Sequence, residues 1–213
     1  KLKVPVTLSK KGRHKIRLLA NGRLWELPII HNSTWNQRFA ETESLVEKLN
    51  TNSDLAPSSI ATLRYNLQRN KKLWREAIRE TRWLGGQINR TLKWAKAMSQ
   101  NDDAVLRHRG DLYRAYRSKY DGRLQHYSVH VPRHYDRRKR MPLVIGLHGI
   151  GSGTHYTLRR VLGKDRDLEN NEPGGKPLIR NNMPKLPNYG VITACPWSYH
   201  NSAYWFYGEM DVL

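Results

Sequence analysis

Residues 142–153 restrict the fold most, and they read PLVIGLHGIGSG from Pro142 to Gly153. The first six residues carry no charge, which is typical of a strand buried on both faces of an α/β sheet. The run ends in a glycine-rich turn, and ligand sites in open α/β sheets form where strands end in this way. Residues 156–162, which follow, have helical spacing. We therefore expect a buried strand, a ligand-binding turn and a helix in succession.

Two further strands are predicted on either side of this stretch. Residues 124–131 alternate polar and apolar side chains, and Pro132 closes that segment. Residues 190–195 form a second short apolar run, which ends at Pro196. The connecting segments are a charged turn at 136–140, a loop-rich stretch at 163–188 and the first turn of a helix at 209–213.

Three motifs in this order, residues 127–132, 142–149 and 191–196, resemble the opening of the α/β-hydrolase fold. The closer resemblance is to esterases of the polyhydroxybutyrate-depolymerase and feruloyl-esterase kind and to prolyl-oligopeptidase-like hydrolases. It covers Gly110 to Leu213, about half of the chain. The implied substrate is a small carboxylic ester or a peptide. The implied fold class is α/β, with an N-terminal hairpin and helical region followed by the first strands of an incomplete α/β-hydrolase sheet.

The resemblance also implies roles for the turn His148, Gly149, Ile150 and Gly151. In such hydrolases the backbone amide after His-Gly helps to form the oxyanion hole, and that amide belongs here to Ile150. Gly149 and Gly151 would shape the turn, and His148 would support it without acting as the base. Two other interpretations stay open: a plain strand-to-helix turn, or a backbone nest that binds a phosphate.

The sequence departs from the hydrolase pattern in one respect. It contains no Gly-x-Ser-x-Gly nucleophile elbow. In the hydrolases the serine, acid and histidine all follow the helix that corresponds to the one beginning near Asp211. We therefore assign no catalytic residue. We expect the 213 residues to be the N-terminal portion of such a hydrolase and to be inactive by themselves. Whether the chain continues beyond Leu213 is left open.

The first half divides into two regions ahead of the sheet, which gives three segments: 1–30, 31–109 and 110–213. Residues 1–30 predict a hairpin around Asn21-Gly22, which is a strong turn signal. Residues 35–49 and the long stretch from Pro57 to Met98 have helical periodicity. We expect Gly85-Gly86 to break the long stretch into two helices.

The net charge of +20 supports an alternative function of another class. A basic, non-catalytic binding or assembly subunit would contact nucleic acid or another polyanion. The residues assigned to such a surface are Lys10, Lys11, Arg13, Lys15, Arg69, Lys71 and Lys72. Trp74, Trp83 and Trp94 are candidate stacking surfaces. The other interpretation is a solvated basic face over inward-packed tryptophans.

No cofactor or metal is expected. Cys195 is the only cysteine, so the sequence supports neither an internal disulfide nor a cysteine-based zinc site. His126, His130 and His134 recur at a spacing of four, but they fall on a strand and a turn, where that spacing does not gather ligands. The sequence contains no run of about 18 apolar residues, so it predicts no membrane partner. The chain begins with Lys1, so residues before it are expected to be missing or removed, and the compartment stays open between cytoplasm and export.

An incomplete parallel sheet has a consequence for stability. It would leave an open strand edge and an uncovered apolar face. We therefore expect an isolated chain to aggregate, unless a partner chain or its own N-terminal helices cover the exposed face.

Overall fold

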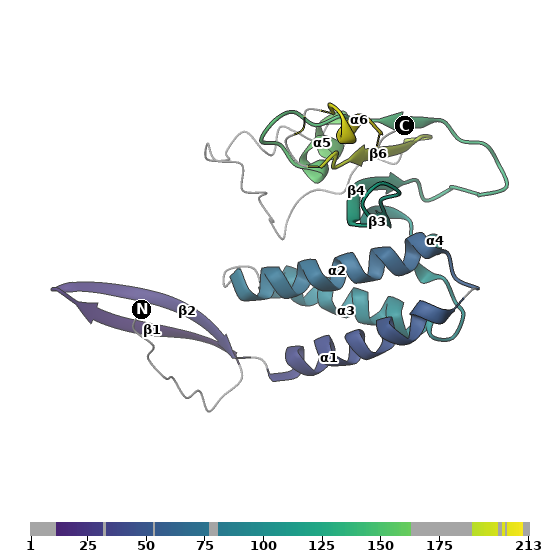
Figure 1. Cartoon of the computed structure of the whole chain (residues 1–213). Helices are drawn as coiled ribbons and strands as arrows, with labels where there is room; N and C mark the ends of the chain where they lie inside the picture. Colours follow the sequence, from purple (N-terminus) through teal and green to yellow (C-terminus); the bar gives the residue numbers. More distant parts are fainter. Residues whose placement is uncertain are drawn as a thin grey trace.

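The computed structural model comprises an N-terminal hairpin, a group of helices and a mixed sheet (Figure 1). It describes residues 12–31, 33–52, 54–76, 81–162, 189–199, 202 and 204–210. Helices together with a mixed sheet confirm the predicted α/β class. No helix in these described ranges is long and apolar enough to cross a membrane.

Strands β1 (Gly12–Ala20) and β2 (Arg23–His31) form the predicted antiparallel hairpin. Asn21 and Gly22 make its two-residue turn with φ values of 50° and 71°. Positive φ at both positions is what a tight hairpin turn requires, and glycine and asparagine adopt it at the lowest cost. The turn signal in the sequence was therefore sufficient to place this element.

Three longer helices follow: α1 (Ser33–Lys48), α2 (Pro57–Glu76) and α3 (Thr81–Met98). The 3-10 helix η1 (Leu49–Thr51) extends α1, and the short helix α4 (Ala104–Arg107) leads to the sheet. The predicted break at Gly85-Gly86 is wrong, because both glycines lie inside α3. A Cβ on Gly85 would lie only 3.0 Å from Cζ2 of Trp35. The glycine at position 85 thus allows α1 and α3 to approach closely.

The sheet contains β3 (Gly110–Arg117), β4 (Leu124–Val131), β5 (Leu143–Ile145) and β6 (Ile192–Pro196). Its order is β3-β4-β6-β5, with β4 antiparallel to both neighbours and β5 parallel to β6. Helix α5 (Thr154–Val161) packs against β4 and β6, and α6 (Tyr207–Met210) is the last described element. Strand β4 has the bounds that the sequence predicted.

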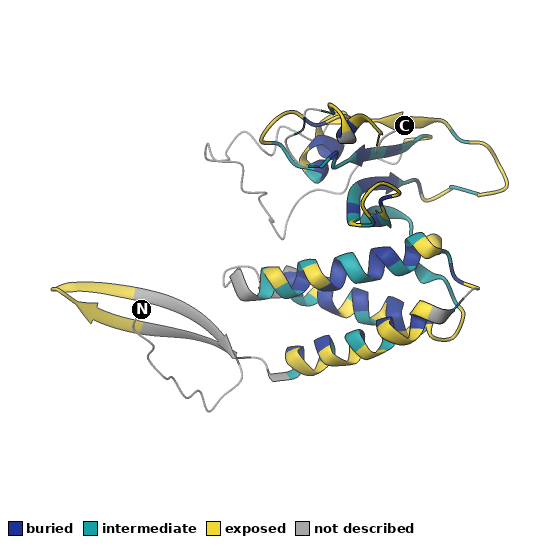
Figure 2. Cartoon of the chain, viewed as in Figure 1, coloured by how far each residue is buried: buried dark blue, intermediate teal, exposed yellow. Residues whose placement is uncertain are grey.

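Helices and sheet share one core. Leu112 of β3 and Val129 of β4 pack in the same buried cluster as Leu63, Trp94 and Met98 of the helices. Figure 2 shows buried and exposed residues alternating along the ribbons of α2 and α3. The N-terminal helices therefore cover one face of the sheet, which is one of the two outcomes expected for that face.

The strand β5 corrects the prediction made from residues 142–153. The apolar run was expected to be buried on both faces, yet Leu143, Val144 and Ile145 are 57%, 38% and 50% exposed. Within the described residues β5 is an edge strand, which pairs with β6 on one side only. Apolar composition indicated burial, but burial depends on a neighbouring strand, and a run of apolar residues does not specify one.

Candidate functional site

The candidate site lies where β5 and β6 end. These two strands are parallel neighbours, so the segments that follow them meet at one edge of the sheet. One segment is the turn from His148 to Gly151, and the other runs from Trp197 to Tyr204. The topology thus brings together residues about fifty positions apart in the sequence.

His148 joins the two segments. Its backbone N–H donates to the hydroxyl of Tyr204 at 3.0 Å, and that hydroxyl donates to the carbonyl of Pro196 at 3.1 Å. Its ring Nε2 lies 2.8 Å from the carbonyl oxygen of Trp197, and Nδ1 lies 3.0 Å from that of Gly149. The ring is only 7% exposed. His148 therefore holds the turn in place, and both ring nitrogens face backbone carbonyls of the site itself.

The turn after His148 contains a backbone amide that has no acceptor among the described residues. Ser152 N–H donates to the carbonyl of Gly149 at 3.0 Å, and Gly151 has a φ of 78°, which favours glycine. Ile150 stands at the tip and is 75% exposed. Its N–H donates no hydrogen bond to any described residue. A fixed N–H group of this kind is a ready donor to an anionic oxygen.

Close packing fixes the strand that carries the turn. A Cβ on Gly146 would lie 2.8 Å from both the sulfur of Cys195 and Cγ2 of Val161. Cys195 itself is fully buried, and burial raises the pKa of its thiol to about 12. A thiol that stays protonated is a poor nucleophile, so Cys195 serves the core, as its position on a strand predicted.

A row of rings connects the turn to the helices. Tyr65 of α2 stacks on His126 of β4 with ring centroids 4.6 Å apart, and His126 lies 4.7 Å from Trp197. Trp197 in turn lies 5.5 Å from His148, which lies 5.4 Å from Tyr204. Burial, and then the charge of Arg69, lowers the pKa of His126 to about 3. This imidazole is therefore neutral at pH 7 and acts as a packing element.

A second polar group lies on the neighbouring strands. Nδ1 of His130 lies 2.6 Å from Oδ1 of Asp111, and His130 is 5% exposed. On β4, His126 is partly buried and His130 is buried, whereas His134 is exposed beyond the strand end. The described part of the chain contains no group of three or more His, Cys, Asp or Glu side chains placed to hold a metal ion.

The serines near the site do not form a nucleophile elbow. Ser198 follows β6 with a φ of 47°, but it is fully buried, and its Oγ lies 3.1 Å from Oγ of Ser202. Gly208 packs directly against it, since a Cβ there would lie 2.3 Å from that Oγ. Among the described residues, Ser198 has no histidine in hydrogen-bonding contact. His200 lies outside the described residues.

Three of the seven residues proposed for polyanion binding have described side chains, and all three lie on α2. Lys10 and Lys11 lie outside the described residues, while Arg13 and Lys15 lie on β1 without described side chains. Arg69 covers the ring of Tyr113 at 4.3 Å, and Lys71 pairs with Glu43. Lys72 is exposed. Arg69 and Lys71 thus each contact a neighbour within the fold.

Two of the three candidate stacking tryptophans pack inward. Trp94 is 6% exposed, and Trp74 packs on Trp35 with centroids 4.6 Å apart. The side chain of Trp83 lies outside the described residues. For Trp74 and Trp94 the interpretation as core residues is the one that the contacts support.

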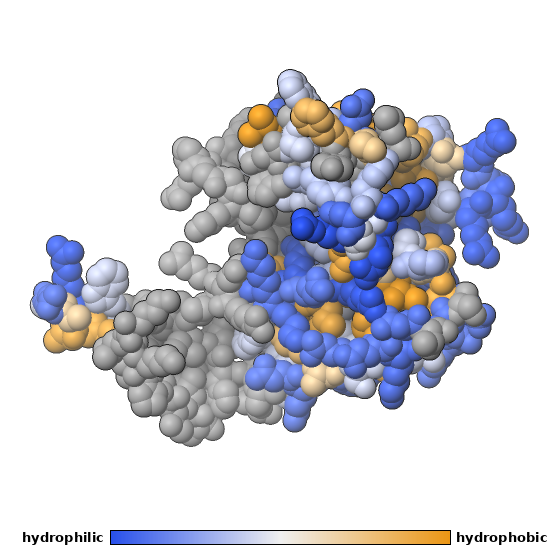
Figure 3. Space-filling view, viewed as in Figure 1, coloured by the Kyte–Doolittle hydropathy of each residue, from blue (hydrophilic) through white to orange (hydrophobic). Residues whose placement is uncertain are grey.

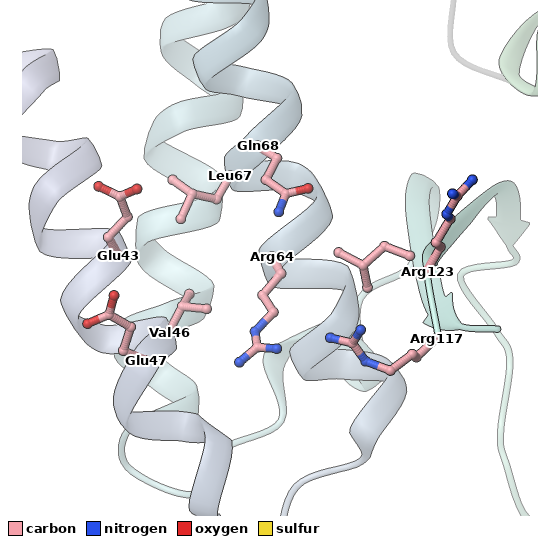
Figure 4. A pocket seen from close by; sticks show the side chains of 9 residues that line it. Glu43, Val46, Glu47, Arg64, Leu67, Gln68, Arg117 and Arg123 are labelled. Carbon is pink, nitrogen blue, oxygen red and sulfur yellow. The ribbon is translucent and has the colours of Figure 1, made fainter. Parts of the chain in front are cut away.

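Sequence reasoning missed one pocket, of about 540 Å³, between α1, α2 and the β3–β4 hairpin (Figure 4). Arg64, Arg117 and Arg123 line it together with Glu43 and Glu47. The signal available in the sequence was the spacing of Glu43 and Glu47, which places both on one helix face. Nothing in the sequence indicated that the hairpin arginines would face them.

The helices and the mixed sheet define an α/β protein, and the candidate site lies at the carboxyl ends of β5 and β6. Comparison with family models, curated proteins and solved structures found no match that narrows this class to a family.

Proposed function

We propose that this chain carries the oxyanion-hole part of a serine esterase or peptidase-like hydrolase of the α/β-hydrolase type. The observation that carries the proposal is the turn that follows a parallel strand, where Ile150 is 75% exposed and its N–H donates to no described residue. The order of the motifs at 127–132, 142–149 and 191–196 supports the same assignment. In that assignment the substrate is a carboxylic ester or a peptide.

The chemistry assigned to the turn is the stabilisation of negative charge. When a nucleophile attacks an acyl carbon, the former carbonyl oxygen becomes an oxyanion. An N–H group that is already fixed donates to this oxygen without reorganising. His148 contributes indirectly, because its ring and backbone hold the turn against Trp197 and Tyr204. It is a positioning residue in this proposal.

The proposal assigns the nucleophile to none of these 213 residues, because they contain no Gly-x-Ser-x-Gly and Ser198 is buried. We therefore expect residues 1–213 alone to show no turnover of p-nitrophenyl acetate. The intact mass of the natively expressed protein then identifies the form to assay. Ester turnover by residues 1–213 alone would contradict the assignment.

Replacing Ile150 by proline tests the turn directly in an active form of the protein. Ile150→Pro removes the N–H group, whereas the matched control Ile150→Ala keeps it. Loss of one oxyanion donor lowers kcat by about 10²- to 10³-fold, so we expect that loss for the proline variant and less than a threefold change for the alanine variant. Equal kcat values in the two variants would show that the amide does not contact the reacting oxygen.

A second candidate function rests on the net charge of +20, which neither ester hydrolysis nor solubility requires. We infer polyanion binding as the alternative. Hydrophilic side chains dominate the described helical surface in Figure 3, and Arg137, Arg138, Lys139 and Arg140 form an exposed basic turn before β5.

Binding of a single-stranded RNA oligonucleotide tests this alternative. Because phosphate contacts release counterions, affinity is expected to fall by at least about tenfold between 50 and 200 mM salt. Replacing the four basic residues at 137–140 by glutamine is expected to reduce that salt dependence. Undetectable binding at low ionic strength, or binding that salt does not change, excludes the alternative.

A further inference from the structure

The pocket between α1, α2 and the β3–β4 hairpin has two charged walls of opposite sign. Figure 4 shows Glu43 and Glu47 on α1 on one side, with Arg64 on α2 and Arg117 on the hairpin across from them. Its volume of about 540 Å³ is in the range of small-ligand sites. The pocket lies apart from the turn at Ile150, on the helical side of the hairpin.

Arg123 of the lining pairs with Asp121 at 3.6 Å, but Arg64 and Arg117 have no carboxylate partner within the described residues. Arg64 donates to the side-chain oxygen of Asn50, and Nη1 of Arg117 donates to the carbonyl of Gly122 at 2.5 Å. Both acceptors are neutral. A pair of guanidinium groups with neutral partners suits a carboxylate, which accepts hydrogen bonds from each.

The acidic wall offers one free carboxylate. Glu43 already pairs with Lys71. Glu47, one turn further along α1, makes no ion pair or hydrogen bond with any described residue. A cationic group of a ligand is therefore expected at Glu47 in preference to Glu43.

Apolar side chains line the pocket between the two walls. Val46 and Leu67 are 4% and 7% exposed, so they are part of the packed interior, and Leu124 is half-buried. The lining is therefore complementary to a ligand with a carboxylate, an apolar group and a cation. Inorganic phosphate provides neither the apolar group nor the cation.

We propose that this pocket binds the C-terminal end of a peptide. The terminal carboxylate lies between Arg64 and Arg117, the last side chain contacts Val46, Leu67 and Leu124, and a basic residue before it pairs with Glu47. The hairpin is also tied to the candidate site, because Oγ of Ser118 lies 2.7 Å from the hydroxyl of Tyr199, which follows β6. The proposal requires no turnover and stands independently of the hydrolase assignment.

Calorimetric titration with acetyl-Lys-Leu tests the proposal on the full 213-residue chain. The free acid is expected to bind at least tenfold more tightly than the same dipeptide with an amidated C-terminus. Arg64→Gln and Arg117→Gln are each expected to weaken binding of the free acid at least tenfold. Neither is expected to change the affinity for the amidated dipeptide. Arg107→Gln, which alters an exposed arginine outside the pocket, is the matched control and is expected to change neither affinity.

Two further comparisons identify the ligand class. Glu47→Gln is expected to weaken binding of acetyl-Lys-Leu severalfold and to leave the affinity for acetyl-Ala-Leu unchanged. Thermal melting of each variant establishes that it is folded. Three outcomes would overturn the proposal. They are equal affinity for the free acid and the amide, tighter binding of inorganic phosphate than of the dipeptide, and no binding of the dipeptide at 10 mM.

Discussion

At the scale of single residues, glycines set how closely the elements approach. Gly85 leaves room for Trp35, and Gly146 leaves room for Cys195 and Val161. Neither position has the positive φ that would explain a glycine by backbone conformation. The sequence suggested a helix break at the first and a buried strand at the second. Only the neighbours in the fold explain both, because each glycine is required by a side chain far away in the sequence.

Gly146→Ala is therefore expected to destabilise the protein. The added Cβ would lie 2.8 Å from buried side-chain atoms, and overpacking of this kind costs about 1–3 kcal/mol. Gly149→Ala is the control, since nothing lies within 4 Å of its Cβ position, and its effect is expected to stay below about 0.5 kcal/mol. Urea unfolding of both variants measures the difference. Identical midpoints would contradict the close packing of β5 against α5 and β6.

At the scale of elements, the two edges of the sheet differ. Helix α2 covers the β3 edge with polar side chains: Oγ1 of Thr62 accepts from the N–H of Ala115 at 2.9 Å, and Nδ2 of Asn66 donates to the carbonyl of Tyr113 at 3.3 Å. The β5 edge has no such cover among the described residues. A covered edge does not pair with other chains, whereas an exposed apolar edge can. The expected open edge is therefore located at β5.

At the scale of the whole molecule, burial of histidines makes stability depend on pH. Burial is the largest cause that lowers the pKa of His126 to about 3 and the pKa values of His108 and His155 to about 4. In the unfolded chain their pKa is about 6.5. Between these values the unfolded state binds more protons than the folded state, so the free energy of unfolding falls as the pH falls from about 6.5 towards 4.

The free energy of unfolding is accordingly expected to be lower at pH 5.5 than at pH 7, with His126 contributing roughly 1 kcal/mol. His126→Phe keeps a ring against Tyr65 and Trp197 but cannot be protonated, so the difference between the two pH values should shrink. His134→Phe, at an exposed position, should leave it unchanged. Urea unfolding at both pH values measures this difference in the free energy of unfolding. If His126→Phe leaves the difference unchanged, other groups cause the pH dependence.

The sequence by itself determined the local elements of this protein. The hairpin turn at Asn21-Gly22, the strand from Leu124 to Val131 and the buried position of Cys195 follow from turn chemistry and from apolar periodicity, which act between near neighbours. It also placed the glycine-rich turn after a strand. These features need no knowledge of what lies across the fold.

Only the tertiary structure decided which distant groups meet. It set β5 at the edge of the described sheet, joined His148 to Trp197 and Tyr204, and placed the arginines of the hairpin opposite the glutamates of α1. Nothing in the sequence distinguishes Arg69 or Trp94 from an exposed basic or stacking residue. In the fold, Arg69 lies over the ring of Tyr113, and Trp94 is buried. Burial and charge pairing are properties of neighbours in space, and a side chain's own identity does not specify them.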